Sequence, residues 1–207
     1  MVLYHYTVGE EVREFVRFIS ALPIATDIAV STGLVFALVQ IVRFVSKEMF
    51  QRFYFKDELE MPTTRLLLLT DHFLSREDKL KIRSKIKSDF DLHLPDEHEE
   101  LAHGIETRKN IAFAVSQIRK QLSGNQMVIR HNIEYGFVRN ILGGCALALF
   151  MCVLDLTIFT WLKPSVVAQQ VTLICTLIYS IPIVSSRYLM QRFGYYYAKI
   201  LFEQYIH

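Results

Sequence analysis

Apolar residues are concentrated in three long runs, and each run is long enough to cross a lipid bilayer. A helix rises about 1.5 Å per residue, so crossing the hydrocarbon core takes about 20 mostly apolar residues. The first run covers residues 22–42 and contains Asp27, the second covers 141–162 with Asp155 as its one charge, and the third covers 166–185 with no charge. The pattern predicts an α-helical integral membrane protein with three transmembrane helices.

The distribution of Lys and Arg predicts how these helices are oriented. Residues 163–165 form a short turn, so the second and third runs make a helical hairpin. Basic residues gather after the first run, before the second and after the third, and such clusters favour the cytoplasmic side. We therefore expect segment 1–21 to be external and the bulk of the remainder to be cytoplasmic. If residues 22–42 are instead re-entrant or interfacial, the N-terminus moves inside and the hairpin is unchanged.

The stretch from 43 to 139 carries nearly balanced charges and predicts a cytoplasmic, α-rich domain. Ser75 followed by Asp78 resembles a capping box and predicts a helix that ends near residue 89. Acidic residues at the start of 97–122 favour a second helix by interaction with its dipole. Both segments place apolar residues at spacings of three and four, as core-facing helices do.

Other parts of this domain allow more than one interpretation. Residues 65–70 (RLLLLT) fit a buried strand, although a buried helical turn is also possible, so an α+β domain stays open. Residues 47–60 extend the first helix until Pro62. Residues 127–140 either continue as helix into the second span, which we favour, or form a strand first. Residues 186–207 are expected to be a cytoplasmic amphipathic tail.

Composition excludes several classes of protein. The 207 residues are 52% hydrophobic, and 23 Lys and Arg are nearly matched by 21 Asp and Glu. Such a chain is not disordered, and direct binding to double-stranded DNA is not expected. The three cysteines all fall within predicted spans, so they form no exported disulfide framework. His93, His98 and His103 repeat every five residues rather than every three or four, so we expect no metal site and no cofactor.

Polar side chains inside the spans are the strongest candidates for function. Burying a carboxylate at a helix centre costs at least about 2.5 kcal/mol, so such groups usually face protein or water. One interpretation is that they line a polar path once several chains assemble, and the other is that they only hold helices together. Asp155 is the strongest candidate, and the full set is Asp155, Asp27, Gln169, Thr172, Thr176 and Ser180.

A second group of polar residues lies just before the second span. On a helix, Arg130 and Glu134 are neighbours four residues apart, and His131 lies near Tyr135. This segment is either a structural junction or a hinge facing a ligand, from which a signal passes into the hairpin. The candidate residues are Arg130, His131, Asn132, Glu134, Tyr135 and Arg139.

Catalytic motifs give little support for an enzyme. The chain has no glycine-rich phosphate loop, no Gly-x-Ser-x-Gly and no His-Glu-x-x-His, so no catalytic residue is assigned. Arg65 and His72 match the Arg-x4–6-His spacing of HEPN ribonucleases. That match would imply a membrane-tethered nuclease, although the intervening LLLLTD suits a strand better.

Three segments also resemble a group of small bacterial membrane proteins: KEMFQRFYFKDELEMPTT, LSREDKLKIRSKIKSDF and RHNIEYGFVRNILGG, followed by an apolar hairpin. By architecture the chain is similar to the transmembrane effectors of anti-phage defence loci, of the retron-associated or cyclic-nucleotide-associated type. The resemblance implies a homo-oligomer in the bacterial inner membrane that contacts lipid and permeabilises it when triggered by a partner protein or nucleotide signal. The alternative is a non-conducting adaptor that binds a partner protein.

Overall fold

The computed structural model describes residue 14, residues 28–56 and residues 58–207, and its regular elements in these ranges are all helices. Three helices are long and apolar enough to cross a membrane, namely Ile28–Phe55, Gln126–Leu162 and Val166–Val184. The three predicted spans are therefore matched by three helices. The external segment 1–21 and Asp27 lie outside the described residues.

The chain divides into two compact units, of which the first is Met1–Ile41. Its described part is helical from Ile28 onward, and its apolar side chains are exposed, with Leu34 and Phe36 more than half accessible. A helix that is apolar on all sides and covered by no protein is typical of a segment that faces lipid.

The second unit, Val42–His207, begins with the continuation of this helix. A π-helical turn, η1 (Lys47–Arg52), leads into α2 (Phe53–Phe55), and Lys56 ends the helix in the left-handed conformation with φ of 43°. The end was expected at Pro62, but Pro62 instead occupies the first turn of the next helix, α3 (Pro62–Arg65). Proline suits this position because the first-turn amide needs no intrahelical acceptor.

Two of the next helices begin at side-chain caps, of which the one at Ser75 was predicted. The Ser75 hydroxyl accepts the amide hydrogen of Asp78 at the start of α4 (Arg76–Phe90). Asp96 and Glu99 form a capping box at α5 (Glu97–Ala102). The single helix expected over 97–122 is divided at His103, whose ψ of 49° is not helical, and α6 (Gly104–Gln121) follows.

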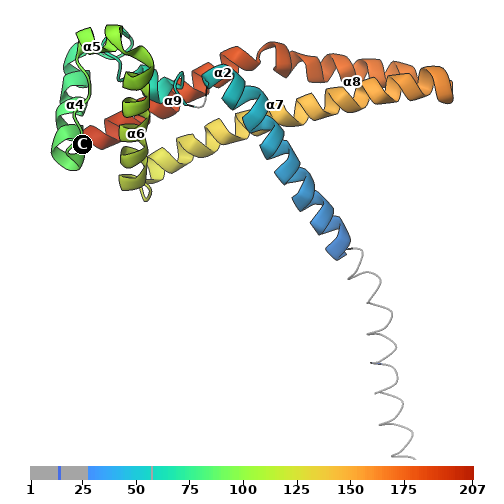
Figure 1. Cartoon of the computed structure of the whole chain (residues 1–207). Coiled ribbons are helices and arrows are strands. Elements are labelled where there is room, and N and C mark those ends of the chain that lie inside the picture. The colour runs from blue at the N-terminus through green and yellow to red at the C-terminus, as the bar shows by residue number, and fades with distance from the viewer. Residues whose placement is uncertain (1–13, 15–27, 57) are drawn as a thin grey trace, which may run out of the picture. The chain divides into compact units, whose positions relative to one another are not determined.

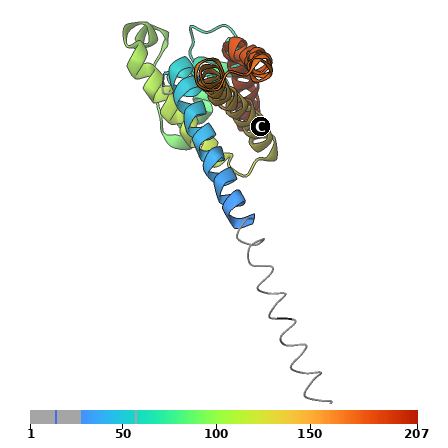
Figure 2. The same cartoon turned by 90° about the vertical axis from the view of Figure 1, so that its right-hand side faces the viewer.

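Asn125 then caps α7 (Gln126–Thr157), which runs as one helix through residues 127–140 and confirms the interpretation that we favoured. A π-helical turn, η2 (Ile158–Leu162), and the short turn after it lead into α8 (Val166–Val184). α7 and α8 lie side by side in both views (Figures 1 and 2) and form the predicted hairpin.

The last helix, α9 (Ser186–Ile206), is a core element of the fold. Its Leu201 and Phe202 are fully buried, and it packs against α3, α4, α6 and α7. The expected amphipathic tail therefore completes the same body as α3 to α6, which we call the helical domain; Figure 1 shows α9 entering it. Its core contains Leu66, Leu67, Leu68, Ile82, Ile86, Ile111, Val115, Ile118, Val128, Leu201 and Phe202.

The strand expected over 65–70 is wrong. α3 ends at Arg65, and the following leucines form turns without a partner strand in the described ranges. Their side chains are nevertheless buried in the core of the helical domain. A buried segment of this kind needs hydrogen-bond partners for its backbone, because unpaired buried amides and carbonyls cost free energy.

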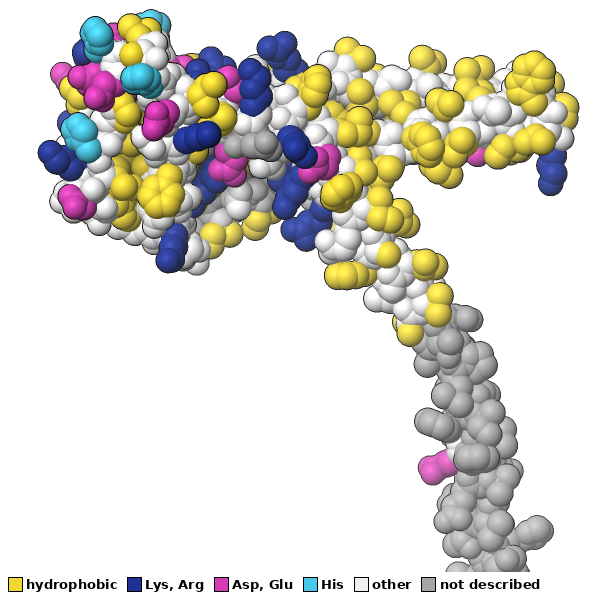
Figure 3. Space-filling view, in the orientation of Figure 1, with side chains coloured by type: hydrophobic (Ala, Val, Ile, Leu, Met, Phe, Trp, Pro, Cys, Tyr) yellow, Lys and Arg dark blue, Asp and Glu magenta, His cyan; other side chains and the backbone are white. Residues whose placement is uncertain are grey.

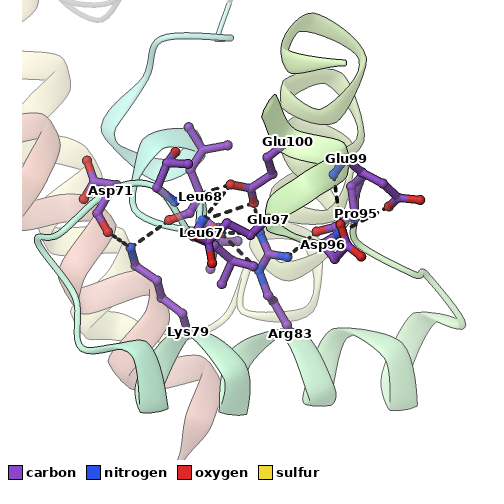
Figure 4. A network of polar contacts seen from close by, with 12 residues as sticks. Leu67, Leu68, Asp71, Lys79, Arg83, Pro95, Asp96, Glu97, Glu99 and Glu100 are labelled. Atoms are coloured by element: carbon purple, nitrogen blue, oxygen red, sulfur yellow. Dashed lines mark hydrogen bonds and ion pairs between the residues drawn. The ribbon is translucent and has the colours of Figure 1, made fainter. Parts of the chain in front are cut away.

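Three buried charged residues supply those partners, and we call them the ionic clamp: Lys79, Arg83 and Glu100 (Figure 4). The Glu100 carboxylate accepts the amide hydrogen of Leu69 at 2.9 Å. The Arg83 guanidinium donates to the Leu67 carbonyl at 2.7 Å and pairs with Glu100. The Lys79 ammonium donates to the Leu68 carbonyl at 2.7 Å, and burial lowers its pKa.

Replacing Glu100 tests whether the ionic clamp holds this segment. In Glu100→Gln the Arg83 charge stays buried without its counter-ion, so the free energy of unfolding should fall by about 3 kcal/mol. Glu106→Gln is the matched control, because Glu106 is exposed at the start of α6. Urea titration in mild detergent, followed by far-UV circular dichroism, measures both. Equal losses in the two variants would contradict a structural role for the Glu100 charge.

Close approach between two helices depends on one glycine of α7. A Cβ built on Gly143 would clash with the Ser46 Oγ and would lie 2.8 Å from the Val42 carbonyl oxygen. Nothing lies within 4 Å of the corresponding position on Gly144. Gly143 therefore lets residues 42–46 pack directly against α7.

Gly143→Ala should separate these helices, because the Val42 carbonyl belongs to the backbone and moves only with its helix. Overpacking of this kind costs about 1–3 kcal/mol. Gly144→Ala adds the same methyl group to the same helix without a clash and should leave the melting temperature in detergent unchanged. If the Gly143→Ala protein had the same melting temperature as the wild type, the two helices would not be tightly packed at this position.

Candidate functional site

A cavity of about 790 Å³ lies beside α7 between the helical domain and the hairpin. Its volume falls in the range of small-molecule sites in proteins. Its walls come from segments far apart in the chain, including residues 42–55, α6, the first half of α7 and α9. We call it the junction cavity, and its polar lining includes Arg43, Lys47, Gln51, Glu58, Arg119, Asn132, Tyr135, Arg139, Asn140 and Tyr197.

A small apolar cluster fixes the positions of these walls. Phe50 and Phe55 from the first helix pack with Leu142 of α7 and Met190 of α9, and all four are buried. Tyr135 belongs to the same cluster and is 5% exposed. Because α7 contributes to the cluster and to the cavity wall, its polar side chains are held at fixed positions.

Two of the arginines are partly tied to neighbouring groups. Arg119 lies 3.3 Å from the Glu58 carboxylate and donates to the Thr63 hydroxyl at 3.1 Å, and its guanidinium also lies over the Tyr197 ring. Arg139 donates to the Gln51 side-chain oxygen at 2.6 Å. Each arginine has five N–H donors, so both keep donors available for a further partner.

Several buried polar atoms at this cavity have no hydrogen-bond partner among the described residues. Of the buried side-chain atoms without a partner in the described part of the chain, four belong to residues that line it. Buried polar atoms are nearly always paired, so such a group indicates a missing ligand or water. The atoms are the Tyr135 hydroxyl, Arg139 Nε, Arg119 Nε and Asn140 Oδ1.

The charge of the lining is strongly positive. Four cations line the cavity, and Glu58 is the one carboxylate among its lining residues. Arg43 and Lys47 make no ion pair with the described residues. In Figure 3, Lys and Arg side chains gather where the helical domain meets the hairpin, while hydrophobic side chains cover the hairpin. The arrangement suits an anion.

The residues expected at this junction separate into two groups. Asn132, Tyr135 and Arg139 line the cavity. Arg130, His131 and Glu134 do not, because Glu134 pairs with Arg130 at 3.4 Å and with His131 at 2.9 Å on the helix surface. That second group stabilises α7 locally by pairs three and four residues apart.

Sequence reasoning missed the part of the site that comes from other helices: Arg43, Lys47, Gln51, Arg119 and Tyr197. Arg43 and Lys47 belong to the basic residues after the first apolar run, which by themselves predict only the orientation of that run. Their density beside an apolar run was the available signal, but their convergence on Arg139 depends on tertiary packing.

The polar residues of the hairpin are mostly satisfied within it. The hydroxyls of Thr172, Thr176 and Ser180 donate to the carbonyls four residues earlier, at 2.9, 2.8 and 2.7 Å. Thr172 and Cys152 are both buried between α7 and α8. This stripe thus faces the partner helix of the same chain, as small and hydroxyl residues do in membrane helix pairs.

Two other candidates in the hairpin differ from this stripe. Gln169 donates to the Phe159 carbonyl at 2.7 Å and joins the start of α8 to η2. Asp155 is half-buried, and the described residues provide its carboxylate with no hydrogen bond or ion pair. Asp155 is therefore the hairpin residue that most needs a partner outside this chain or water.

The remaining candidates do not converge on a site. Arg65 ends α3 with its guanidinium 3.9 Å from the Asp71 carboxylate, and His72 is exposed in an irregular segment, so no shared helix terminus joins them. His93, His98 and His103 are exposed, and the described ranges contain no group of metal-ligating side chains. Comparisons with protein-family models, curated proteins and solved structures find no match to this chain.

Gln169→Leu should loosen the closed end of the hairpin, because it removes the bond to Phe159. Interhelical bonds of this kind average about 0.6 kcal/mol in membrane proteins. Trp161 is the one tryptophan of the chain, and acrylamide quenching of its fluorescence should increase. Gln170→Leu is the control, since Gln170 is exposed and makes no side-chain bond to the described residues. Equal quenching in both variants would contradict this closing role.

Proposed function

We propose that this chain is an oligomeric membrane effector, which permeabilises the bacterial inner membrane when a trigger acts on its helical domain. The three apolar helices support placement in a membrane. The asymmetry of Lys and Arg supports a cytoplasmic helical domain, because basic residues flank the ends of the spans nearest to it. The resemblance to anti-phage effectors supports placement in the bacterial inner membrane.

The continuity of α7 is the observation that supports coupling between the trigger and the membrane. The helix runs without a break from Gln126 to Thr157. Tyr135 and Arg139 on it line the junction cavity, and Asp155 lies further along it in the hairpin. A ligand that turns or shifts the first half of α7 therefore moves the hairpin with it, because an intact helix transmits such motions as a rigid element.

The exposed surface of the hairpin supports assembly. An unpaired carboxylate at Asp155 is costly against lipid and inexpensive against water or a second chain. Contacts between copies would bury Asp155, and several copies would be needed to enclose a polar path, because three helices alone are too few. The exposed apolar side chains of α8 that contacts between copies leave uncovered would then face lipid.

Leakage of potassium or of a dye from bacterial cells, compared between the wild type and a variant of Asp155, tests this function. Asp155→Asn keeps the size of the side chain and removes its charge, so leakage caused by the triggered wild type, expressed with its genomic neighbours, should fall by about tenfold or more. Asp91→Asn is the control, because Asp91 is exposed in the left-handed position after α4, where asparagine is equally suitable.

Insertion and assembly must be matched before the leakage values are compared. Membrane fractionation and cross-linking establish that Asp155→Asn inserts and assembles like the wild type. Unchanged leakage in such a variant would remove the path lined by Asp155. An absence of leakage from the triggered wild type would remove permeabilisation as the function.

A non-conducting adaptor is the second candidate, and the satisfied hydroxyls of α8 favour it. Thr172, Thr176 and Ser180 all bond to their own helix, as they would in a hairpin that serves only as an anchor. In that case, replacing α8 and the second half of α7 with an unrelated hairpin would preserve activity. Loss of activity after the exchange would favour the effector.

A further inference from the structure

An exposed apolar ridge adjoins the junction cavity on α7. Its members are spaced four residues apart, so they form a row along the helix surface. They are between 41% and 65% exposed. We call them the α7 ridge: Ile129, Ile133, Phe137 and Ile141.

The ridge and the cavity are continuous with each other. Ile129, Ile133 and Phe137 also line the cavity, beside Asn132 and Arg139. A cationic hollow with an apolar ridge at its edge matches a molecule with an anionic head and an apolar tail. A soluble anion would use the hollow and leave the ridge exposed to water.

The cavity also lies at the depth of lipid headgroups, given the membrane placement proposed above. The apolar run of the first helix ends next to Arg43, and the apolar part of α7 begins just after Asn140. Both residues line the cavity. Basic pockets at the cytoplasmic ends of membrane helices are suited to phosphate headgroups.

We propose that the junction cavity binds the phosphate headgroup of an anionic phospholipid, with its acyl chains passing Ile141 and lying beside the apolar part of α7. Arg43 and Lys47 make no ion pair with a carboxylate in the described ranges, so their charges are available to the headgroup. Arg139 supplies further guanidinium donors, and the buried Tyr135 hydroxyl donates to a phosphate oxygen. This inference deepens the proposed function and rests on its placement of α7 in the membrane.

Lipid retention by the full-length chain measures this site without any leakage assay. The protein is purified in mild detergent and titrated with phosphatidylglycerol or with phosphatidylcholine of the same acyl chains, and bound lipid is counted by native mass spectrometry. We expect phosphatidylglycerol to bind about tenfold more tightly, since charge-assisted bonds are the strong ones. Equal retention of the two lipids would overturn the proposal.

Two variants locate the binding. Tyr135→Phe removes a hydroxyl that has no partner among the described residues, so it should fold normally and bind phosphatidylglycerol about tenfold more weakly. Arg43→Gln with Lys47→Gln should weaken binding further. Arg187→Gln with Lys199→Gln removes the same charge from residues that do not line the cavity and should retain the lipid. Unchanged binding in both cavity variants would overturn the site.

Inorganic phosphate and glycerol 3-phosphate distinguish the two sources of the anion. We expect neither to displace phosphatidylglycerol at concentrations equal to that of the lipid, because neither has an acyl chain that contacts the apolar part of α7. Displacement at equal concentration would overturn the lipid assignment and indicate a soluble phosphate ligand. Selective lipid retention by a protein that never permeabilises membranes would overturn the proposed effector function alone.

Discussion

The hydrogen-bonded backbone of α7 is the constraint on which the other features depend. A segment that crosses hydrocarbon has to satisfy each amide and carbonyl internally, and the part of α7 in the hairpin is an intact helix that is long and apolar enough to do so. The same helix continues into the helical domain, where Val128 joins the core. Tyr135 and Leu142, between these ends, join the cluster beside the cavity. One rigid element thus has to satisfy a protein core, a polar cavity and an apolar hairpin at successive positions.

Local signals made much of this fold predictable from sequence. The helix start at Ser75 depends on a side chain that bonds to an amide three residues away, and it forms. The acidic residues from Glu97 onward likewise mark the start of α5. The hairpin was equally accessible, because length and apolarity alone determine a span. Each of these features is encoded within a few neighbouring residues, which is why a single sequence was enough to find it.

The errors concern residues whose structure depends on distant partners. The leucines after Arg65 fit a strand by pattern, but Glu100 accepts their amides from 31 residues away. α9 was interpreted as a tail because its sequence does not show that Leu201 meets the domain core. Of the residues that line the junction cavity, only those on α7 were predicted as candidates. Arg139 reaches Gln51 across 88 residues, and no local pattern encodes that contact.

The cations around the cavity bear both on the orientation of the helices in the membrane and on the recognition of a ligand. Flanking Lys and Arg that only set orientation have no reason to converge, since scattered positions lower their mutual repulsion. Here Arg43, Lys47, Arg119 and Arg139 share one cavity with a single carboxylate. Clustered cations beside a low-dielectric hairpin repel one another more strongly than in water. An anion in the cavity would offset that repulsion and accept hydrogen bonds from the buried donors of Tyr135 and Arg139, so one ligand accounts for both the charge excess and these unpaired donors.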